Sequence, residues 1–235
     1  MDAGRKERGA GKRGIDRDVY HGALRAVVVA FLTLVSASLR AQPLENGPFS
    51  PDDLVELTRL DSTLRLDIRY ATPRNFMKRP MYTQARAFLQ RPAADALVRV
   101  HTTLTRKGFG LLVFDGYRPW SVTKKFWDET PVSSHKFVAD PAKGSRHNRG
   151  CAVDLSLFDL AAGKEVDMPS PYDSFSASAA ADFAGGSARQ RRMRDILKAA
   201  MEAEGFRVNP DEWWHFDYRE WRNYRILDVP FSELR

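Results

Sequence analysis

Residues 145–157 read Ser145-Arg146-His147-Asn148-Arg149-Gly150-Cys151-Ala152-Val153-Asp154-Leu155-Ser156-Leu157. From residue 151 onward apolar and polar residues alternate, which is the pattern of a strand that has one face in the core. We expect the apolar side chains to pack inward and Asp154 to lie with Ser156 on the open face. Gly150 allows a turn just before this strand. The turn would let His147 and Asp154 converge on one point.

A second block lies near the end of the chain and reads Glu212-Trp213-Trp214-His215. Two imidazoles and one carboxylate can hold a zinc ion in three positions and leave the fourth position open for water. His147, Asp154 and His215 supply this set. Glu212, three residues before the last ligand, is placed to take a proton from that water. The two blocks together predict a zinc-dependent hydrolase with one zinc ion per subunit.

The rest of the chain reads as a mixture of helices and short strands. We expect helices over residues 92–107, 121–129 and 188–204, and strands over residues 64–70, 110–114 and 213–218. Residues 170–186 are rich in Ser, Ala, Gly and Asp and predict a long surface loop that borders the site. Mixed element order of this kind favours an α+β fold, with a small central antiparallel sheet flanked by helices in a single domain.

Other residues with reactive side chains fit structural roles better. Cys151 is the only cysteine, and a catalytic thiol would need a histidine of its own. We interpret it as a small buried residue. His101 falls within an expected amphipathic helix and His135 within a polar segment, so neither is included in the site.

The net charge of +7 does not predict a nucleic-acid partner. Residues 1–41 hold eight of the 37 basic and four of the 30 acidic residues, so 29 basic and 26 acidic residues remain, a net of +3. No basic block interleaved with aromatic residues occurs in that remainder.

The first 41 residues have the pattern of an export signal. Basic residues precede a ten-residue apolar run at 26–35, which is too short to span a bilayer and fits the apolar part of a signal peptide. We expect cleavage after Ala41, or after Ala37, and a mature domain of residues 42–235 without stable membrane insertion. The alternatives are a basic tail or an uncleaved anchor, and without a signal the protein would be cytoplasmic.

The two blocks form the pattern S-x-H-x-x-G-x-A-x-D followed by E-x-W-H, which resembles the D-alanyl-D-alanine dipeptidase branch of the zinc D,D-peptidases, the VanX-like family. Upstream, Asp115-Gly116-Tyr117-Arg118-Pro119 and the segment Asp67-Ile68-Arg69-Tyr70-Ala71-Thr72 with Asn75-Phe76 also look like that family. The resemblance covers residues 54–224. It implies the zinc D,D-peptidase fold, which is also described as hedgehog-like.

The resemblance also implies a role for individual residues. Zinc would be bound by the three residues named above, Glu212 would be the general acid/base, and Arg118 would stabilise the oxyanion. Asp173 and Ser145 match residues that hold the free ammonium group of a dipeptide. Arg118, Asp173 and Ser145 also have structural interpretations. Arg118 would form a salt bridge with Asp115, and Asp173 and Ser145 would be turn or cap residues.

The activity implied is hydrolysis of D-alanyl-D-alanine, or a similar small D,D-dipeptide, to free amino acids. One alternative is a D,D-carboxypeptidase or endopeptidase that trims peptidoglycan stem peptides, which needs an open cleft. Another is a non-catalytic zinc-binding module, which would have no use for Glu212. The sequence leaves open the physiological substrate, a recycling or resistance role, the oligomeric state and the native metal.

Overall fold

The computed structural model describes residues 41–235, and residues 42–235 form one compact unit. The expected signal segment, residues 1–41, lies outside the described residues except for Ala41. Within the described part, no helix is both long enough and apolar enough to cross a bilayer.

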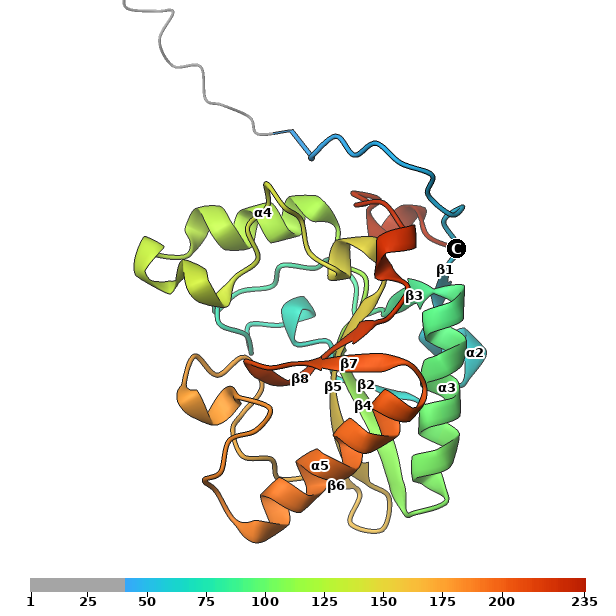
Figure 1. Cartoon of the computed structure of the whole chain (residues 1–235), viewed down its shortest axis with the longest axis vertical. Coiled ribbons are helices and arrows are strands. Elements are labelled where there is room, and N and C mark those ends of the chain that lie inside the picture. Colours follow the sequence, from blue (N-terminus) through green and yellow to red (C-terminus); the bar gives the residue numbers. More distant parts are fainter. Residues whose placement is uncertain (1–40) are drawn as a thin grey trace, which may run out of the picture. The chain divides into compact units, whose positions relative to one another are not determined.

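The centre of the fold is a six-stranded sheet (Figure 1). Its strands are β2 (Arg65–Leu66), β4 (Phe109–Asp115), β5 (Ala152–Asp159), β6 (Lys164–Glu165), β7 (Phe206–Asn209) and β8 (Glu212–Tyr218). The order across the sheet is β2-β4-β5-β8-β7, and β6 pairs with the end of β5. β5 is therefore a central strand, with β4 and β8 as antiparallel neighbours on either side.

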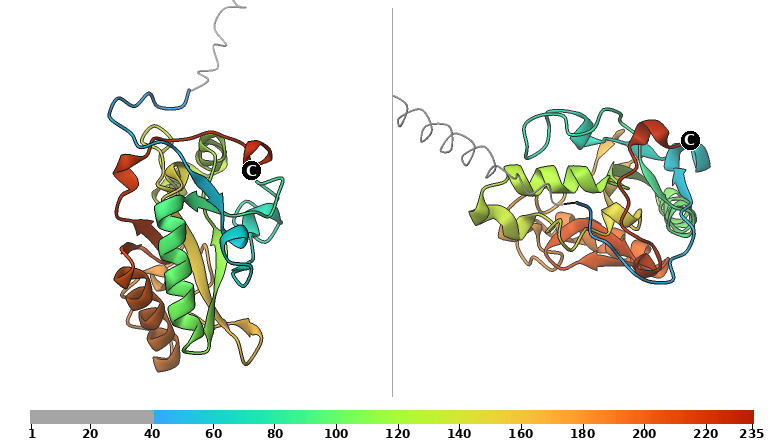
Figure 2. Two further views of the ribbon diagram at one scale, coloured as in Figure 1. Left: turned by 90° about the vertical axis from the view of Figure 1, so that its right-hand side faces the viewer. Right: turned by 90° about the horizontal axis from the view of Figure 1, so that it is seen from above.

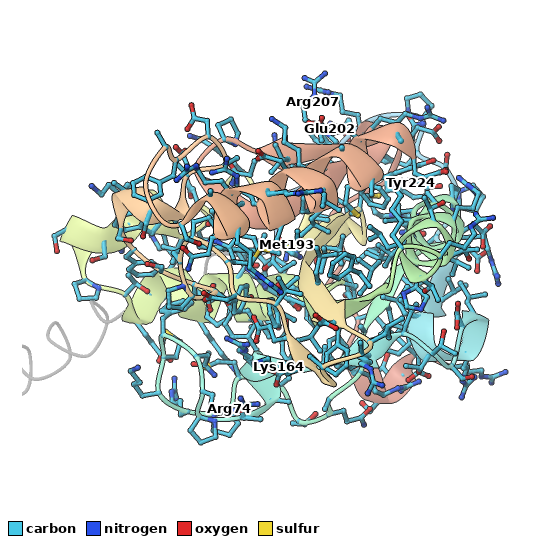
Figure 3. The ribbon with its side chains drawn as sticks, turned by 90° about the horizontal axis from the view of Figure 1, so that it is seen from below. Arg74, Lys164, Met193, Glu202, Arg207 and Tyr224 are labelled. Carbon is cyan, nitrogen blue, oxygen red and sulfur yellow. The ribbon has the colours of Figure 1, made fainter. Side chains whose placement is uncertain are left out.

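Two long helices cover one face of the sheet. They are α3 (Arg91–Thr105) and α5 (Ala188–Ala203), which contact each other and lie side by side (Figures 1 and 2). Ser187 and Gln190 form a capping box at the start of α5, which satisfies two backbone donors that the first turn would leave free. Gly205, at a φ of 86°, ends it. Figure 3 shows Met193 of α5 pointing into the interior, whereas Arg74 lies on the opposite side of the molecule.

Shorter elements surround this core. They are β1 (Leu54–Glu56), α2 (Leu57–Leu60), β3 (Phe88–Gln90), α4 (Trp120–Glu129) and the 3₁₀ turns Arg69–Ala71, Val132–Phe137, His147–Arg149, Ala177–Ala179, Trp221–Asn223 and Phe231–Glu233. β1 and β3 form a separate antiparallel pair. The segment that includes Arg69–Ala71 lies across the sheet from α5 (Figure 2). It forms one wall of the site described below.

The structure confirms the α+β class, the three helices and the strands of residues 110–114 and 213–218, with bounds that shift by one or two residues. The expected strand of residues 64–70 is wrong beyond Leu66. The amide of Asp67 makes the final bond to β4, and the carbonyl of Tyr70 then accepts the amides of Met81 and Tyr82, which draws the chain away from the sheet. The sheet is also not wholly antiparallel, because β2 pairs with β4 in parallel.

The expectation that Asp154 and Ser156 lie on an open face is wrong. Asp154 is 3% exposed and Ser156 is fully buried. The polar face of β5 is covered by the loop of residues 170–186, whose Tyr172 donates a hydrogen bond to Asp154 Oδ2. The alternation of apolar and polar residues therefore predicted the two faces of the strand correctly. It did not predict that the polar face forms the floor of a pocket.

Candidate metal centre and catalytic pocket

Three side chains that can bind a metal converge where β5 and β8 meet. Asp154 on β5 and His215 on β8 are direct cross-strand partners, so their side chains share one face of the sheet. His147 comes from the 3₁₀ turn just before β5. Gly150 reverses the chain there at a φ of 65°, a conformation that favours glycine. All three residues are buried, and their ligand atoms lie within 4.8 Å of one another.

The spacing of the three atoms fits a tetrahedral ion. His147 Nε2 lies 3.1 Å from His215 Nδ1. Asp154 Oδ1 lies 3.4 Å from the first nitrogen and 3.0 Å from the second. Bonds of about 2.0–2.1 Å at tetrahedral angles would place two zinc ligands roughly 3.3 Å apart. The cluster therefore has the dimensions of three corners of a zinc site.

The outer nitrogens of both imidazoles are held by acceptors. His147 Nδ1 donates to the carbonyl of Gly116 at 2.7 Å, and His215 Nε2 donates to Asp217 Oδ1 at 3.0 Å. With protons on those outer nitrogens, the lone pairs of His147 Nε2 and His215 Nδ1 both point at the cluster. Hydrogen bonds of this kind fix the tautomer and orientation of metal-binding histidines.

The cluster attracts positive charge. Asp154 Oδ1 is buried and accepts no hydrogen bond from the described residues. Burial opposes ionisation of Asp154, but the two histidines hold its pKa well below the usual range. Burial likewise opposes charge on His215, yet the neighbouring carboxylates of Asp154 and Asp217 raise its pKa well above the ordinary value. The donor set and the orphaned oxygen both fit a divalent metal.

Glu212 lies at the edge of this cluster. Its Oε2 accepts a hydrogen bond from Asn209 Nδ2 at 2.8 Å and lies 3.7 Å from His215 Nδ1. Burial raises the pKa of Glu212, and the nearby His215 only partly offsets this. A carboxylate with a raised pKa holds a proton more readily than an ordinary glutamate, which suits a group that accepts and returns a proton beside a metal cluster.

Arg118 is both a salt-bridge partner and a lining residue of the pocket. Its Nε and Nη2 donate to Asp115 Oδ2 at 3.1 and 2.7 Å, which bears out the salt bridge considered from the sequence. No hydrogen bond of Nη1 occurs within the described part of the chain. Tyr82 and the amide of Gly116 hold the other oxygen of Asp115. The arginine is therefore fixed by one edge and faces the pocket.

Asp173 lines the same pocket from the loop of residues 170–186. Its backbone has a φ of 59°, which is unusual for a residue other than glycine. Oδ1 accepts a hydrogen bond from Tyr70 at 3.1 Å, whereas Oδ2 is buried and has no partner among the described residues. Burial, together with the charge of Asp154, raises the pKa of Asp173 well above the usual range.

The pocket joins all seven residues singled out from the sequence. Its volume is about 260 Å³, and its lining contains His147, Asp154, His215, Glu212, Arg118, Asp173 and Ser145. Ser145 Oγ accepts a hydrogen bond from the amide of His147 at 3.2 Å, so it also serves as a local turn residue. Cys151, by contrast, is fully buried outside this lining, and burial raises the pKa of its thiol.

Sequence reasoning missed several residues that hold the site together. Tyr172 donates to Asp154 Oδ2 at 3.0 Å, and Tyr70 donates to Asp173. Tyr172 could be noticed only because it lies beside Asp173, and Tyr70 only as part of the segment 67–72 that resembles the family. Asp217 did have one, because it follows His215 by two residues and so shares its face of the strand.

Comparisons with known proteins give a consistent result. The model of a peptidase family described as D-Ala-D-Ala dipeptidase matches residues 51–232. A D-alanyl-D-alanine dipeptidase from Escherichia coli strain K12 is 31% identical over 180 residues, which are 77% of this chain and 92% of the relative. A D-alanyl-D-alanine dipeptidase from Enterococcus faecium is 32% identical over 178 residues, which are 67% of this chain and 87% of the relative.

Among solved structures, the chain is similar to the LD-carboxypeptidase LdcB, at 20% identity and a TM-score of 0.45. The match covers 81% of this chain and 82% of that one.

Proposed function

The chain belongs to the D-alanyl-D-alanine dipeptidase family, and from this we propose that it hydrolyses D-alanyl-D-alanine with one zinc ion held by His147, Asp154 and His215. The support is the family match together with three buried ligand atoms at tetrahedral spacing. Zinc bound there supplies a Lewis acid and lowers the pKa of water toward about 7. The protein is a metallopeptidase, and its other residues bind the dipeptide and move protons.

Glu212 is the general acid/base in this proposal. Its carboxylate takes a proton from the attacking water and then delivers it to the amine that leaves when the peptide bond breaks. The raised pKa supports both steps, because it brings the carboxyl group closer to the working pH than an ordinary glutamate would be. Asn209 holds the carboxylate in place through its hydrogen bond to Oε2.

Arg118 stabilises the oxygen of the scissile carbonyl as negative charge develops on it. Because Asp115 fixes two guanidinium nitrogens, the side chain needs no reorganisation when that charge appears. The rings of Tyr70 and Phe126 lie 5.2 and 4.9 Å from the Arg118 Cζ atom and shield the guanidinium from water. The salt bridge and the catalytic role are therefore compatible.

The observation that carries the dipeptidase assignment is the unpartnered oxygen of Asp173. A buried carboxyl oxygen without a donor is costly unless a ligand supplies one. The free ammonium group of a dipeptide is such a donor, and it forms strong charge-assisted bonds to carboxylates. Ser145 lies in the same small pocket, where its hydroxyl is a second polar group for the substrate.

Replacement of Asp173 tests this assignment. We expect Asp173→Asn to raise the KM for D-alanyl-D-alanine at least tenfold and to leave zinc content unchanged. Asp182→Asn, an exposed acid in the same loop, is the matched control and should have no effect. If Asp173→Asn instead left the free dipeptide unaffected while N-acetyl-D-alanyl-D-alanine was cleaved, the protein would be a D,D-carboxypeptidase.

Glu212 argues against the remaining alternative, a non-catalytic zinc-binding module. Binding alone does not need a proton acceptor beside the metal. Glu212→Ala that changed no measured property would support that reading.

We also propose that the protein is exported to the periplasm and acts on dipeptides derived from peptidoglycan. The basic start and ten-residue apolar run of the leader support this. Secretion of the full chain from a Gram-negative host should give a periplasmic protein whose first residue is Gln42, identified by intact mass. A full-length cytoplasmic product would contradict export.

A further inference from the structure

A second hollow lies along the sheet from the catalytic pocket. It is about 410 Å³ and is lined by residues of β7, β8 and the turn that follows β8, together with Arg146. Arg146 also lines the catalytic pocket, so the two hollows meet at this side chain. We call the second hollow the arginine groove. Its polar and aromatic lining residues are Arg146, Phe206, Arg207, Asp217, Tyr218, Arg219, Trp221 and Arg222.

The arginine groove has more positive charge than its acids neutralise. Arg146 pairs with Asp217 at 3.3 Å, and Arg219 pairs with Glu220 at 3.6 Å. Arg207 and Arg222 form no salt bridge with any described residue. Arg207 lies directly across from Asp217 on the neighbouring strand, so both side chains are on one face of the sheet. Figure 3 shows its guanidinium extending outward from the protein.

Trp221 orders the guanidinium groups around it. The Cζ atoms of Arg222 and Arg146 lie 4.3 and 4.8 Å from the centre of its ring. A guanidinium that stacks on an aromatic ring keeps its N–H groups free at the edge, where they match the paired oxygens of a carboxylate or phosphate. The groove therefore offers donors that are partly ordered in advance.

Asp217 cannot supply the missing negative charge to these donors. Its Oδ1 accepts from His215 Nε2 at 3.0 Å, and its Oδ2 lies against Arg146. Both oxygens are thus committed to the metal-binding histidine and to the arginine at the boundary of the two hollows. Arg207 and Arg222, which are exposed, are therefore the arginines of the groove that can bind an external anion.

We propose that the arginine groove is a second binding site, which takes an anionic group, phosphate or carboxylate, beside the catalytic pocket. Arg207 and Arg222 bind the anion, and Trp221 holds Arg222 in place. The site is separate from the ammonium-binding end of the pocket, because Asp173 does not line it. Binding of the anion does not depend on the proposed dipeptidase activity and can be measured without it.

The test is calorimetric titration of the zinc-loaded full chain at low salt, with inorganic phosphate in one arm and citrate in the other. We expect saturable binding, weakened at least tenfold in Arg207→Gln/Arg222→Gln. The control is Arg191→Gln/Arg192→Gln on α5, which removes the same charge elsewhere and should bind as the parent protein does. Hydrolysis of D-alanyl-D-alanine without added anion should be the same in all three proteins.

The two arms identify the chemistry, since preference for phosphate or for citrate shows which oxyanion the groove takes. Three results would overturn the proposal. The first is that neither anion binds saturably. The second is that Arg207→Gln/Arg222→Gln binds the anion as well as the parent protein does, which would place the anion on the zinc ion. The third is that the α5 control loses as much binding, which would make the effect one of net charge.

Discussion

At the scale of single residues, the metal cluster gathers negative charge and lone pairs that no cation among the described residues neutralises. Two imidazole lone pairs and a carboxylate oxygen face one another at 3.0–3.4 Å. Without a cation these atoms repel, because the outer nitrogens are already committed to Gly116 and Asp217. Zinc therefore contributes to the stability of the fold as well as to catalysis, since a ligand that binds only the folded state stabilises it.

This leads to a prediction for Asp154. Zinc should raise the melting temperature of metal-free protein, by an amount equivalent to about 4 kcal/mol at a thousandfold excess over Kd. Asp154→Asn replaces a charged ligand with a weaker neutral one and should lose most of that increase. Asp95→Asn, on the exposed side of α3, should retain it. Thermal unfolding with and without zinc checks this, and an equal increase in all three proteins would place the metal elsewhere.

The three residues of the metal cluster could be singled out from the sequence because each lies in a short block with diagnostic spacing. The residues that hold them in place could not. Tyr172 reaches Asp154 from 18 positions along the chain, and Tyr70 reaches Asp173 from 103 positions away. Contacts of that kind depend on how loops pack, and neither periodicity nor composition encodes them locally.

At the scale of elements, α3 and β4 are joined by a buried histidine. The amide of Leu111 donates to His101 Nδ1 at 3.1 Å, and His101 Nε2 lies 2.9 Å from Thr63 Oγ1. Because Nδ1 accepts, Nε2 carries the proton and the ring is neutral. Burial lowers the pKa of His101 from 6.5, with the charge of Asp61 opposing this. The sequence predicted that His101 lies in an amphipathic helix, and the structure shows that its side chain links this helix to β4 and to Thr63.

His101 should make stability depend on pH. Its pKa is lower in the folded state than in the unfolded state, so the unfolded chain binds more protons between the two values. The contribution of neutral His101 to the free energy of unfolding is fully present above pH 6.5. It is lost as the pH falls from 6.5 toward the pKa of His101 in the folded state. We expect His101→Gln to be less stable at pH 7.5 but to show a flatter decline toward pH 5.

Urea unfolding of metal-free proteins measures this, because the metal ligands then contribute alike to each sample. His135→Gln, at a half-buried position in the 3₁₀ turn Val132–Phe137, is the control and should decline as the parent protein does. A decline in His101→Gln as steep as in the parent protein would show that another group is responsible.

The turn that places His147 depends on Gly150. A Cβ atom there would lie 2.4 Å from Leu54 Cδ2 and 3.3 Å from the backbone nitrogen of Gln90, at a φ of 65°. Gly150→Ala should lower the free energy of unfolding by about 2 kcal/mol or more and weaken zinc binding.

Gly163 separates the two causes of that loss. Its φ is 66° and a Cβ atom would meet nothing within 4 Å, so Gly163→Ala should cost only the backbone strain, about 1 kcal/mol. Equal losses for the two variants in denaturant titrations would contradict the steric argument for Gly150.

At the scale of the whole molecule, the fold brings distant segments to one pocket. Asp115, Asp154 and His215 lie in register across three neighbouring strands, while Asp173 arrives on the loop of residues 170–186. The sequence predicted the helices, the buried strands and the bordering loop, because each has its own local pattern. It did not predict the parallel pairing of β2, which depends on the order of strands in the sheet. Nor did it predict the coverage of β5, which depends on how the loop of residues 170–186 packs.

The most direct test of the central claim is amino-acid release from D-alanyl-D-alanine by the zinc-loaded full chain, run beside Glu212→Gln and with L-alanyl-L-alanine as a second substrate. We predict release from the D,D-dipeptide but not from the L,L-dipeptide. Glu212→Gln should be slower by about 10²–10⁴-fold with its zinc retained. No release from the D,D-dipeptide by fully zinc-loaded protein, or equal rates in Glu212→Gln, would contradict the account.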